Sequence, residues 1–210
     1  MEILLKERQE NGKMGNNIVY TYGGGLYINM TNRCTNKCEF CVRQMTDGLG
    51  GADSLWLDRE PEVSEVIEAL KAFRAEDYEE IIFCGYGEPA MRLDDVLEVA
   101  RYLKEHTDTK VRINTNGLAD LIYGKRTAPM LEGVIDRVSI SLNEADAEAY
   151  DALCHPTFGK ESYDAILTYI RDVKQYVEDV AVSVVSCIPK DAVERCGKIA
   201  EDLDVKFKVR

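Results

Sequence analysis

Three cysteines lie close together near the start of the chain and are the residues best suited to do chemistry. In TNRCTNKCEFCVRQ, residues 31–44, Cys34, Cys38 and Cys41 follow a C-x3-C-x2-C spacing with no Gly or Pro between them. The neighbouring residues are mostly polar, so we expect a loop, which we call the cysteine loop. Three soft thiolates at this spacing suit zinc or an iron–sulfur cluster. The spacing therefore predicts a metal site.

The number of ligands bears on which metal this is. A closed structural zinc site needs four protein ligands, usually as two spaced pairs. The other cysteines and the histidines are scattered along the chain: Cys84, Cys154, Cys187, Cys196, His106 and His155. Zinc would need Cys84 or His155 as its fourth ligand, and this alternative stays open. A four-iron cluster also wants four ligands, so three cysteines leave one iron open, which is typical of a catalytic centre.

Four further motifs follow apolar runs and contain glycines or polar residues. They are FCGYGEPAMR (83–92), NTNG (114–117), SISLN (139–143) and VVSCIP (184–189). Glycine permits close approach to the backbone, and a carboxylate such as Glu88 can receive an ammonium group. Taken alone, FCGYGEPAMR is better explained as a Gly-Pro turn after a buried strand.

Together, the cysteine loop and these motifs resemble the radical S-adenosylmethionine (SAM) superfamily over residues 26–210. CTNKCEFC resembles the C-x3-C-x-aromatic-C signature of that superfamily. The resemblance implies that Cys34, Cys38 and Cys41 bind a 4Fe–4S cluster and that SAM chelates the fourth iron. It also implies a radical SAM enzyme, in which the reduced cluster cleaves SAM to a 5'-deoxyadenosyl radical that abstracts hydrogen from an unknown substrate.

The resemblance further implies which residues hold SAM. Phe40 would pack by its backbone near the adenine, Gly-Tyr-Gly-Glu would receive the amino group, and Ile188 would line the adenine. Tyr86 departs from the superfamily's Gly-Gly-Glu-Pro pattern. His155 follows the fourth strand where some relatives place an arginine toward the SAM carboxylate, but it also fits a plain helix end before Pro156. The expected SAM contacts are Phe40, Gly85, Tyr86, Gly87, Glu88, Asn116, Ser139, Ser141, Asn143, His155 and Ile188.

A narrower resemblance is to the small radical SAM proteins called TatD-family-associated. It is carried by YTYGGGLYINMTNRC, FCGYGEP, RINTNGLA, VSISLN and FKVR. It implies a functional link to a TatD-type hydrolase but no particular reaction, and the chemistry implies an electron donor of flavodoxin or ferredoxin type. Two alternatives remain open: a glycyl-radical-enzyme activase, and a non-enzymatic zinc-binding or interaction module.

The elements that must position these residues alternate between strands and helices. Short runs rich in Val and Ile occur at 26–30, 79–85, 110–115, 136–142, 179–188 and 205–210. Apolar residues at helical spacing fill the intervals, for example over 63–73, 96–103 and 166–177. This pattern predicts an α/β fold, a partial (βα)6 TIM-like barrel with parallel strands and with its chemistry at their carboxyl ends.

The N-terminal region predicts a hairpin over residues 18–30, turned by Gly23, Gly24 and Gly25. A phosphate cradle at these glycines fits less well, since no Lys-Ser/Thr follows and no helix begins there. We expect residues 1–25 to form an N-terminal hairpin extension and residues 26–210 the radical SAM core. Six strands would leave the barrel laterally open, which favours a large substrate such as a peptide or partner protein.

Composition limits the remaining possibilities. The chain has 210 residues with 45% hydrophobic and 30% charged residues, which is ordinary for one globular domain. A formal net charge of −12 works against binding nucleic acid or anionic membranes. No signal peptide or membrane span is evident, and seven cysteines are an odd number for a disulfide framework. We therefore expect a cytoplasmic protein.

Overall fold

The computed structural model describes residues 17–210 of the chain. Residues 1–16 lie outside the described residues, and with them most of the predicted extension 1–25 and the segment considered as a signal peptide. The division into residues 1–25 and 26–210 therefore stays a prediction.

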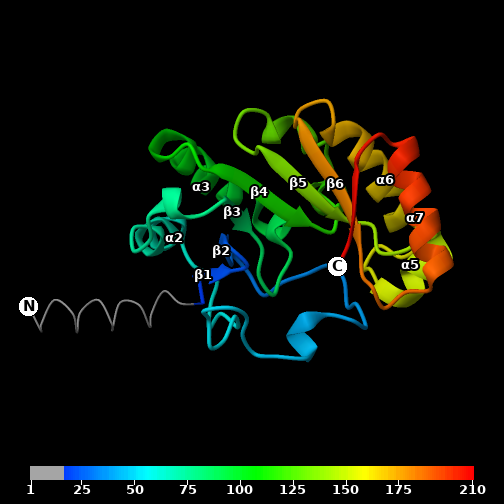
Figure 1. The fold of residues 1–210 in the computed structure, drawn as a ribbon, viewed down its shortest axis with the longest axis horizontal. Coiled ribbons are helices and arrows are strands. Elements are labelled where there is room, and N and C mark those ends of the chain that lie inside the picture. The colour runs from blue at the N-terminus through cyan, green and yellow to red at the C-terminus, as the bar shows by residue number, and fades with distance from the viewer. Residues whose placement is uncertain (1–16) are drawn as a thin grey trace, which may run out of the picture.

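One seven-stranded sheet runs through the molecule, with its strands in chain order (Figure 1). The strands are β1 (Val19–Tyr22), β2 (Gly25–Ile28), β3 (Glu80–Phe83), β4 (Lys110–Thr115), β5 (Arg137–Ser141), β6 (Asp179–Val184) and β7 (Lys206–Val209). β1 pairs antiparallel with β2, and each later strand pairs parallel with the one before it. β1 and β7 lie at the edges, so the sheet is open. The predicted partial barrel with a short hairpin is confirmed.

The hairpin turn consists of Gly23 and Gly24, whose φ angles are 53° and 84°. Positive φ at both positions is what a two-residue hairpin turn of this kind requires, and glycine adopts it without steric cost. Gly25 was predicted to belong to the turn, but it lies in β2 and pairs with Tyr22. The turn is therefore one residue shorter than predicted, because two glycines suffice to reverse the chain.

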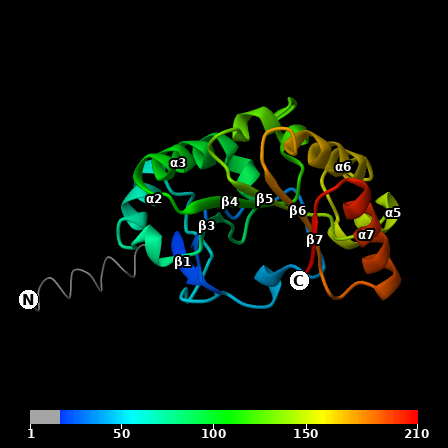
Figure 2. The ribbon, with the colours of Figure 1, turned by 45° about the horizontal axis from the view of Figure 1, so that its top comes forward.

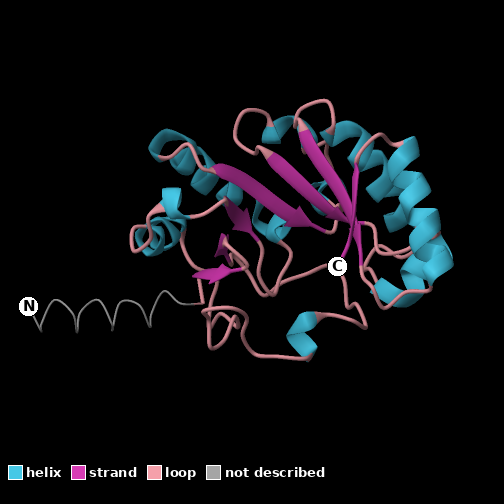
Figure 3. Cartoon of the chain, viewed as in Figure 1, coloured by secondary structure: helices cyan, strands magenta, loops and turns pink. Residues whose placement is uncertain are grey.

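Helices cover one face of the sheet, as Figures 2 and 3 show. They are α2 (Val63–Leu70), η2 (Ala75–Asp77), η3 (Pro89–Arg92), α3 (Leu93–His106), α4 (Ala119–Tyr123), η4 (Ala128–Leu131), α5 (Ala147–Cys154), α6 (Glu161–Val173) and α7 (Lys190–Asp202). The short helix η1 (Val42–Gln44) lies on the other side of the sheet, in the segment between β2 and α2 (Figure 2). The predicted helices at 63–73, 96–103 and 166–177 correspond to α2, α3 and α6. None of the helices in the described part of the chain combines the length and apolar composition that a membrane crossing needs.

The two faces of the sheet differ in polarity. In β4, Val111 and Ile113 are buried against the helices, whereas the alternate residues Arg112 and Asn114 are half-buried on the opposite side. This alternation follows from the two-residue period of a strand. We call the side away from the helices the inner face. It includes Glu80, Ile82, Lys110, Arg112, Asn114, Arg137, Ser139, Ser141, Asp179, Ala181, Ser183, Lys206 and Lys208.

Charged residues join neighbouring strands near the amino end of the inner face. Glu80 forms ion pairs with Arg112, at 2.8 Å, and with Arg137. Asp179 pairs with Arg137 at 2.6 Å and with Lys206 at 2.9 Å. Burial acts against ionisation of Asp179, but hydrogen bonds from Lys206 and Arg137 outweigh it and lower the pKa of the carboxyl group. This ion-pair ladder ties five parallel strands, β3 to β7, together on their polar side.

Glu80→Gln is expected to lower the free energy of unfolding by about 1–3 kcal/mol, because it leaves two partly buried arginines without their carboxylate. The measurement is urea unfolding followed by circular dichroism. Glu68→Gln is the matched control, since its ion pair with Lys71 is exposed and should contribute little to stability. Equal unfolding midpoints for the two variants would contradict a stabilising role for the ladder.

Candidate functional site

The cysteine loop leaves the carboxyl end of β2 and carries all three clustered cysteines. Cys34, Cys38 and Cys41 are half-buried free thiols. Arg43, in η1, donates to two backbone carbonyls of the loop at 3.4 Å each. These two hydrogen bonds keep the loop folded back on itself. The three thiols therefore lie on one short, fixed segment.

The loop is docked on the end of α5. Two of its backbone N–H groups donate to the last carbonyls of that helix, at 3.0 and 3.1 Å. The side chain of Asn36 donates to the hydroxyl of the buried Tyr150 at 2.9 Å. The carbonyls at the end of a helix lack partners within the helix, so α5 provides a ready acceptor for the loop. α5, which lies between β5 and β6, therefore positions the loop that follows β2.

Asn116 connects the cysteine loop to the carboxyl end of β4. Its side-chain amide donates to Oγ1 of Thr35 at 2.9 Å and to Oδ1 of Asn36 at 3.3 Å. Its Oδ1 accepts from the N–H of Leu118 at 3.1 Å. The predicted proximity of this strand end to the cysteine loop is present, and the Asn116 side chain holds the two segments together.

The carboxylate of Glu88 is buried, with 4% of the residue exposed. Oε1 accepts from Oγ1 of Thr115 at 2.7 Å and from the N–H of Ala90 at 3.0 Å, and Oε2 accepts from the N–H of Asn116 at 2.7 Å. Burial raises the pKa of Glu88, although these three donors act in the opposite direction. Three donors from the protein thus hold this carboxylate in place.

Gly87 lies directly against the cysteine loop. A Cβ atom added there would lie 2.2 Å from the carbonyl oxygen of Thr31 and 2.6 Å from that of Arg33. The N–H that follows Gly87 donates to the same Arg33 oxygen at 2.8 Å. Gly85 is similarly crowded, since a Cβ atom there would lie 2.0 Å from Oδ1 of Asn29. Gly87 thus allows a contact between two backbones, and Gly85 a contact with the Asn29 side chain, that a larger residue would prevent.

Tyr86, between these glycines, points away from them into a small aromatic cluster. The residue is 4% exposed, and its hydroxyl donates to the backbone carbonyl of Thr46. Its ring meets the ring of Trp56 edge-on, with centroids 5.1 Å apart. The tyrosine therefore anchors the segment that follows the cysteine loop, which accounts for its departure from the Gly-Gly pattern.

Ser139, Ser141 and Asn143 follow one another along the carboxyl half of β5 and the loop after it. Ser139 and Ser141 are half-buried on the inner face, and Asn143 is 4% exposed. Nη2 of Arg210 donates to Oγ of Ser141 at 3.1 Å and to Oδ1 of Asn143 at 3.3 Å. Burial lowers the pKa of Arg210, whereas the nearby cysteine thiols, when ionised, would raise it. The predicted polar residues thus lie together, and two of them accept hydrogen bonds from the guanidinium of Arg210.

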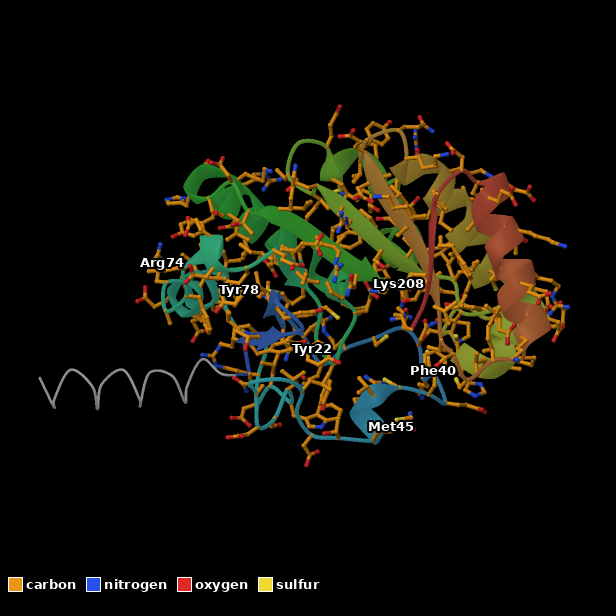
Figure 4. The ribbon with its side chains drawn as sticks, in the orientation of Figure 1. Tyr22, Phe40, Met45, Arg74, Tyr78 and Lys208 are labelled. Carbon is orange, nitrogen blue, oxygen red and sulfur yellow. The ribbon has the colours of Figure 1, made fainter. Side chains whose placement is uncertain are left out.

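The remaining predicted residues lie around the loop. Phe40 is partly buried against the hydrophobic core (Figure 4), and Ile188 is 7% exposed. His155 caps the end of α5 in the left-handed conformation, with φ 43°. Its Nε2 lies 3.4 Å from the Glu39 carboxylate of the cysteine loop, and the side chain is half-exposed. His155 therefore ends α5 and lies beside the cysteine loop.

The donor chemistry of the cysteine loop fits an iron–sulfur cluster. Within residues 17–210 no three His, Cys, Asp or Glu side chains stand together as a preformed metal site. Burial raises the pKa of Cys34 to about 12, and a hydrogen bond with Cys154 lowers that of Cys38. Iron binds the thiolate form, so binding would release these protons. The three thiols are free and share one loop, so they are available as ligands.

Sequence reasoning missed several residues that build the site. Arg210 appeared only as part of the FKVR motif, and Asn36 and Tyr150 were given no role. Their contacts join segments that are 67 to 114 residues apart in the sequence. For Asn36, the only sequence signal was a polar residue in a loop beside cysteines. Tyr150 gave no signal, because a buried aromatic residue in a helix is usually part of the core.

Curated relatives resemble part of the chain. A GTP 3',8-cyclase from Corynebacterium glutamicum is 34% identical over 136 residues, which cover 61% of this chain and 33% of that protein. A GTP 3',8-cyclase from Lactiplantibacillus plantarum is 30% identical over 59% of this chain and 34% of its own. The chain thus spans about a third of the length of these relatives.

Solved structures show the same fold at low identity. A radical SAM methyltransferase from Sphaerobacter thermophilus matches 91% of this chain and 57% of its own, with a TM-score of 0.61 and 17% identity. SuiB from Streptococcus suis, solved with its precursor peptide SuiA, matches 97% of this chain and 42% of its own, with a TM-score of 0.64 and 16% identity. These likenesses concern the fold alone.

The family model of the radical SAM superfamily matches residues 28–203. This range starts at the end of β2, includes the cysteine loop and extends past α7. With three free cysteines at the superfamily's spacing and an open parallel sheet behind them, the chain belongs to the radical SAM superfamily.

Proposed function

We propose that the protein is a radical SAM enzyme in which Cys34, Cys38 and Cys41 hold a 4Fe–4S cluster. The observation that carries the proposal is the cysteine loop itself, which presents three free, half-buried thiols at the carboxyl edge of the parallel strands. Hydrogen bonds from Asn116 and contacts from Gly87 hold this loop against the neighbouring strand ends. That edge is where α/β barrels place their chemistry.

When bound, the cluster and SAM supply an electron and a 5'-deoxyadenosyl group that removes hydrogen from the substrate. The protein positions these partners. We assign the SAM amino group to the turn of residues 85–88, which the Glu88 carboxylate fixes by accepting from the N–H of Asn116. Ser139, Ser141 and Asn143 offer hydroxyl and amide groups for the ribose or carboxylate.

Phe40, Tyr86, Ile188 and His155 complete the proposed SAM environment in different ways. Phe40 and Ile188 supply apolar surface beside the cysteine loop for the adenine. Tyr86 acts indirectly, since its ring and hydroxyl hold the segment after the loop. His155 lies on the loop's outer side with Glu39, so we assign it a supporting role at the end of α5.

The substrate in this proposal is large, such as a peptide or a partner protein. The sheet is open, and the segment between β2 and α2 crosses its inner side with no helix there longer than η1 (Figure 2). SuiB, which shares the fold, was solved with a precursor peptide. The curated relatives are GTP 3',8-cyclases, so GTP is the second substrate to test. A cytoplasmic setting, a flavodoxin- or ferredoxin-type donor and a link to a TatD-type hydrolase remain predictions.

Anaerobic reconstitution tests the proposal. We expect a brown protein with about four irons per chain that cleaves SAM when dithionite is added. One bound zinc and no SAM cleavage would instead support the zinc-binding alternative. Incubation with peptides or with GTP, followed by mass spectrometry, then separates the substrates, and conversion of GTP alone would reject the peptide. Co-purification with a glycyl-radical enzyme would point to the activase.

A further inference from the structure

The inner face carries an excess of positive charge in an acidic protein. Its cations come from β4, β5 and β7 and from the residue after β7: Lys110, Arg112, Arg137, Lys206, Lys208 and Arg210. Its carboxylates are those of Glu80 and Asp179. The chain as a whole has a formal net charge of −12. A local basic face is therefore an exception to the general charge of the molecule.

The charges near the amino end of this face are already matched. Glu80 and Asp179 accept ion pairs from Arg112, Arg137 and Lys206 in the ion-pair ladder. Those cations have protein carboxylates as partners, so they have little attraction left for a ligand.

The two cations toward the carboxyl end differ in this respect. Within residues 17–210, no ion pair joins Lys208 or Arg210 to a carboxylate. Lys208 is exposed, and its Cα partner across the strand pair is Ser183, whose buried Oγ has no hydrogen-bond partner among the described residues. Figure 4 shows Lys208 above Phe40 and Met45 of the segment that carries the cysteines.

Arg210 lies at the same end of the face. Both of its side-chain hydrogen bonds come from Nη2, to the neutral acceptors Ser141 and Asn143. Nη1 and Nε can therefore still donate, and a guanidinium binds carboxylate or phosphate through two parallel N–H groups. The bonds from Nη2 fix the group in place, so little side-chain freedom remains to be lost when an anion binds.

We infer that Lys208 and Arg210 form a binding site for an anionic group of the substrate, a carboxylate or a phosphate, on the inner face beside the cysteine loop. The inference rests on the proposed function, because it assumes that the substrate is bound on this face. It adds that the substrate must carry negative charge, and it places that charge at the end of the sheet where hydrogen would be removed.

Calorimetric titration under anaerobic conditions tests the site. The reconstituted protein is first saturated with SAM. The added anion then cannot bind where the SAM carboxylate binds, so such binding does not contribute to the measured heat. Inorganic pyrophosphate and succinate are then titrated separately at low salt. We expect at least one of them to bind, and Lys208→Gln to weaken it by about fivefold, whereas Lys208→Arg should retain it. The better of the two anions distinguishes phosphate from carboxylate recognition.

Lys198→Gln is the control, since it removes the same charge from α7, on the other face of the sheet. Equal weakening by Lys198→Gln and Lys208→Gln would show a general charge effect and overturn the inference. Binding of neither anion to a protein that holds its cluster and cleaves SAM would also overturn it, while leaving the proposed function intact. Absence of cluster and of cleavage would instead reject the proposed function itself.

Discussion

Replacement of Cys34, Cys38 or Cys41 by serine is expected to reduce bound iron to a small fraction of the wild-type content and to reduce SAM cleavage by about a hundredfold or more. Each variant removes one of three thiolates, and the described residues offer no group of three metal-binding side chains that could substitute for them. Iron and sulfide content, visible absorption and 5'-deoxyadenosine formation measure the effect after anaerobic reconstitution.

Cys187→Ser is the matched control for these variants. Cys187 is also a free thiol, but it is exposed and lies in the loop after β6, away from the cysteine loop in the sequence. It should keep the wild-type iron content. If one of the three loop variants also kept it, that cysteine would not be a ligand, and Cys84 or Cys154 would become the candidate for the third position.

The order of strands and helices could be predicted because it depends on local patterns. Runs rich in Val and Ile separated by helical periodicity specify a βα repeat, and parallel strands in chain order follow from right-handed crossovers. The three cysteines could be found for the same reason, since their spacing is visible within eight residues. The gathering of Glu88 and Asn116 at one edge then follows from the topology.

The direction in which each side chain points could not be predicted. The role of Glu88 at the SAM amino group stays a prediction, and the three buried donors that its carboxylate satisfies were not foreseen. Tyr86 lies in a motif expected to bind SAM, and the packing of its ring on Trp56 was not foreseen. Arg210 reaches residues that are 67 and 69 positions earlier. Such contacts depend on how whole elements pack, and no local pattern in the sequence records them.

Gly87→Ala is the second variant with a large expected effect. A Cβ atom at this position would lie 2.2 Å from the carbonyl oxygen of Thr31, so the backbone of the turn or of the cysteine loop must shift. That shift would strain the hydrogen bond from the N–H of Glu88 to the oxygen of Arg33, which is 2.8 Å long. We expect a loss of about 1–3 kcal/mol in the free energy of unfolding.

The effect of Gly87→Ala on function should exceed its effect on stability, because displacement of reacting groups by about 1 Å can cost a hundredfold in rate. SAM cleavage should therefore fall at least about tenfold in protein that still folds and binds iron. Gly197→Ala is the control, since its added Cβ would meet Phe207 at an ordinary 3.5 Å within α7. If Gly87→Ala reduced cleavage no more than Gly197→Ala did, the turn would not position SAM, and the close approach of Gly87 to the cysteine loop would be a packing feature alone.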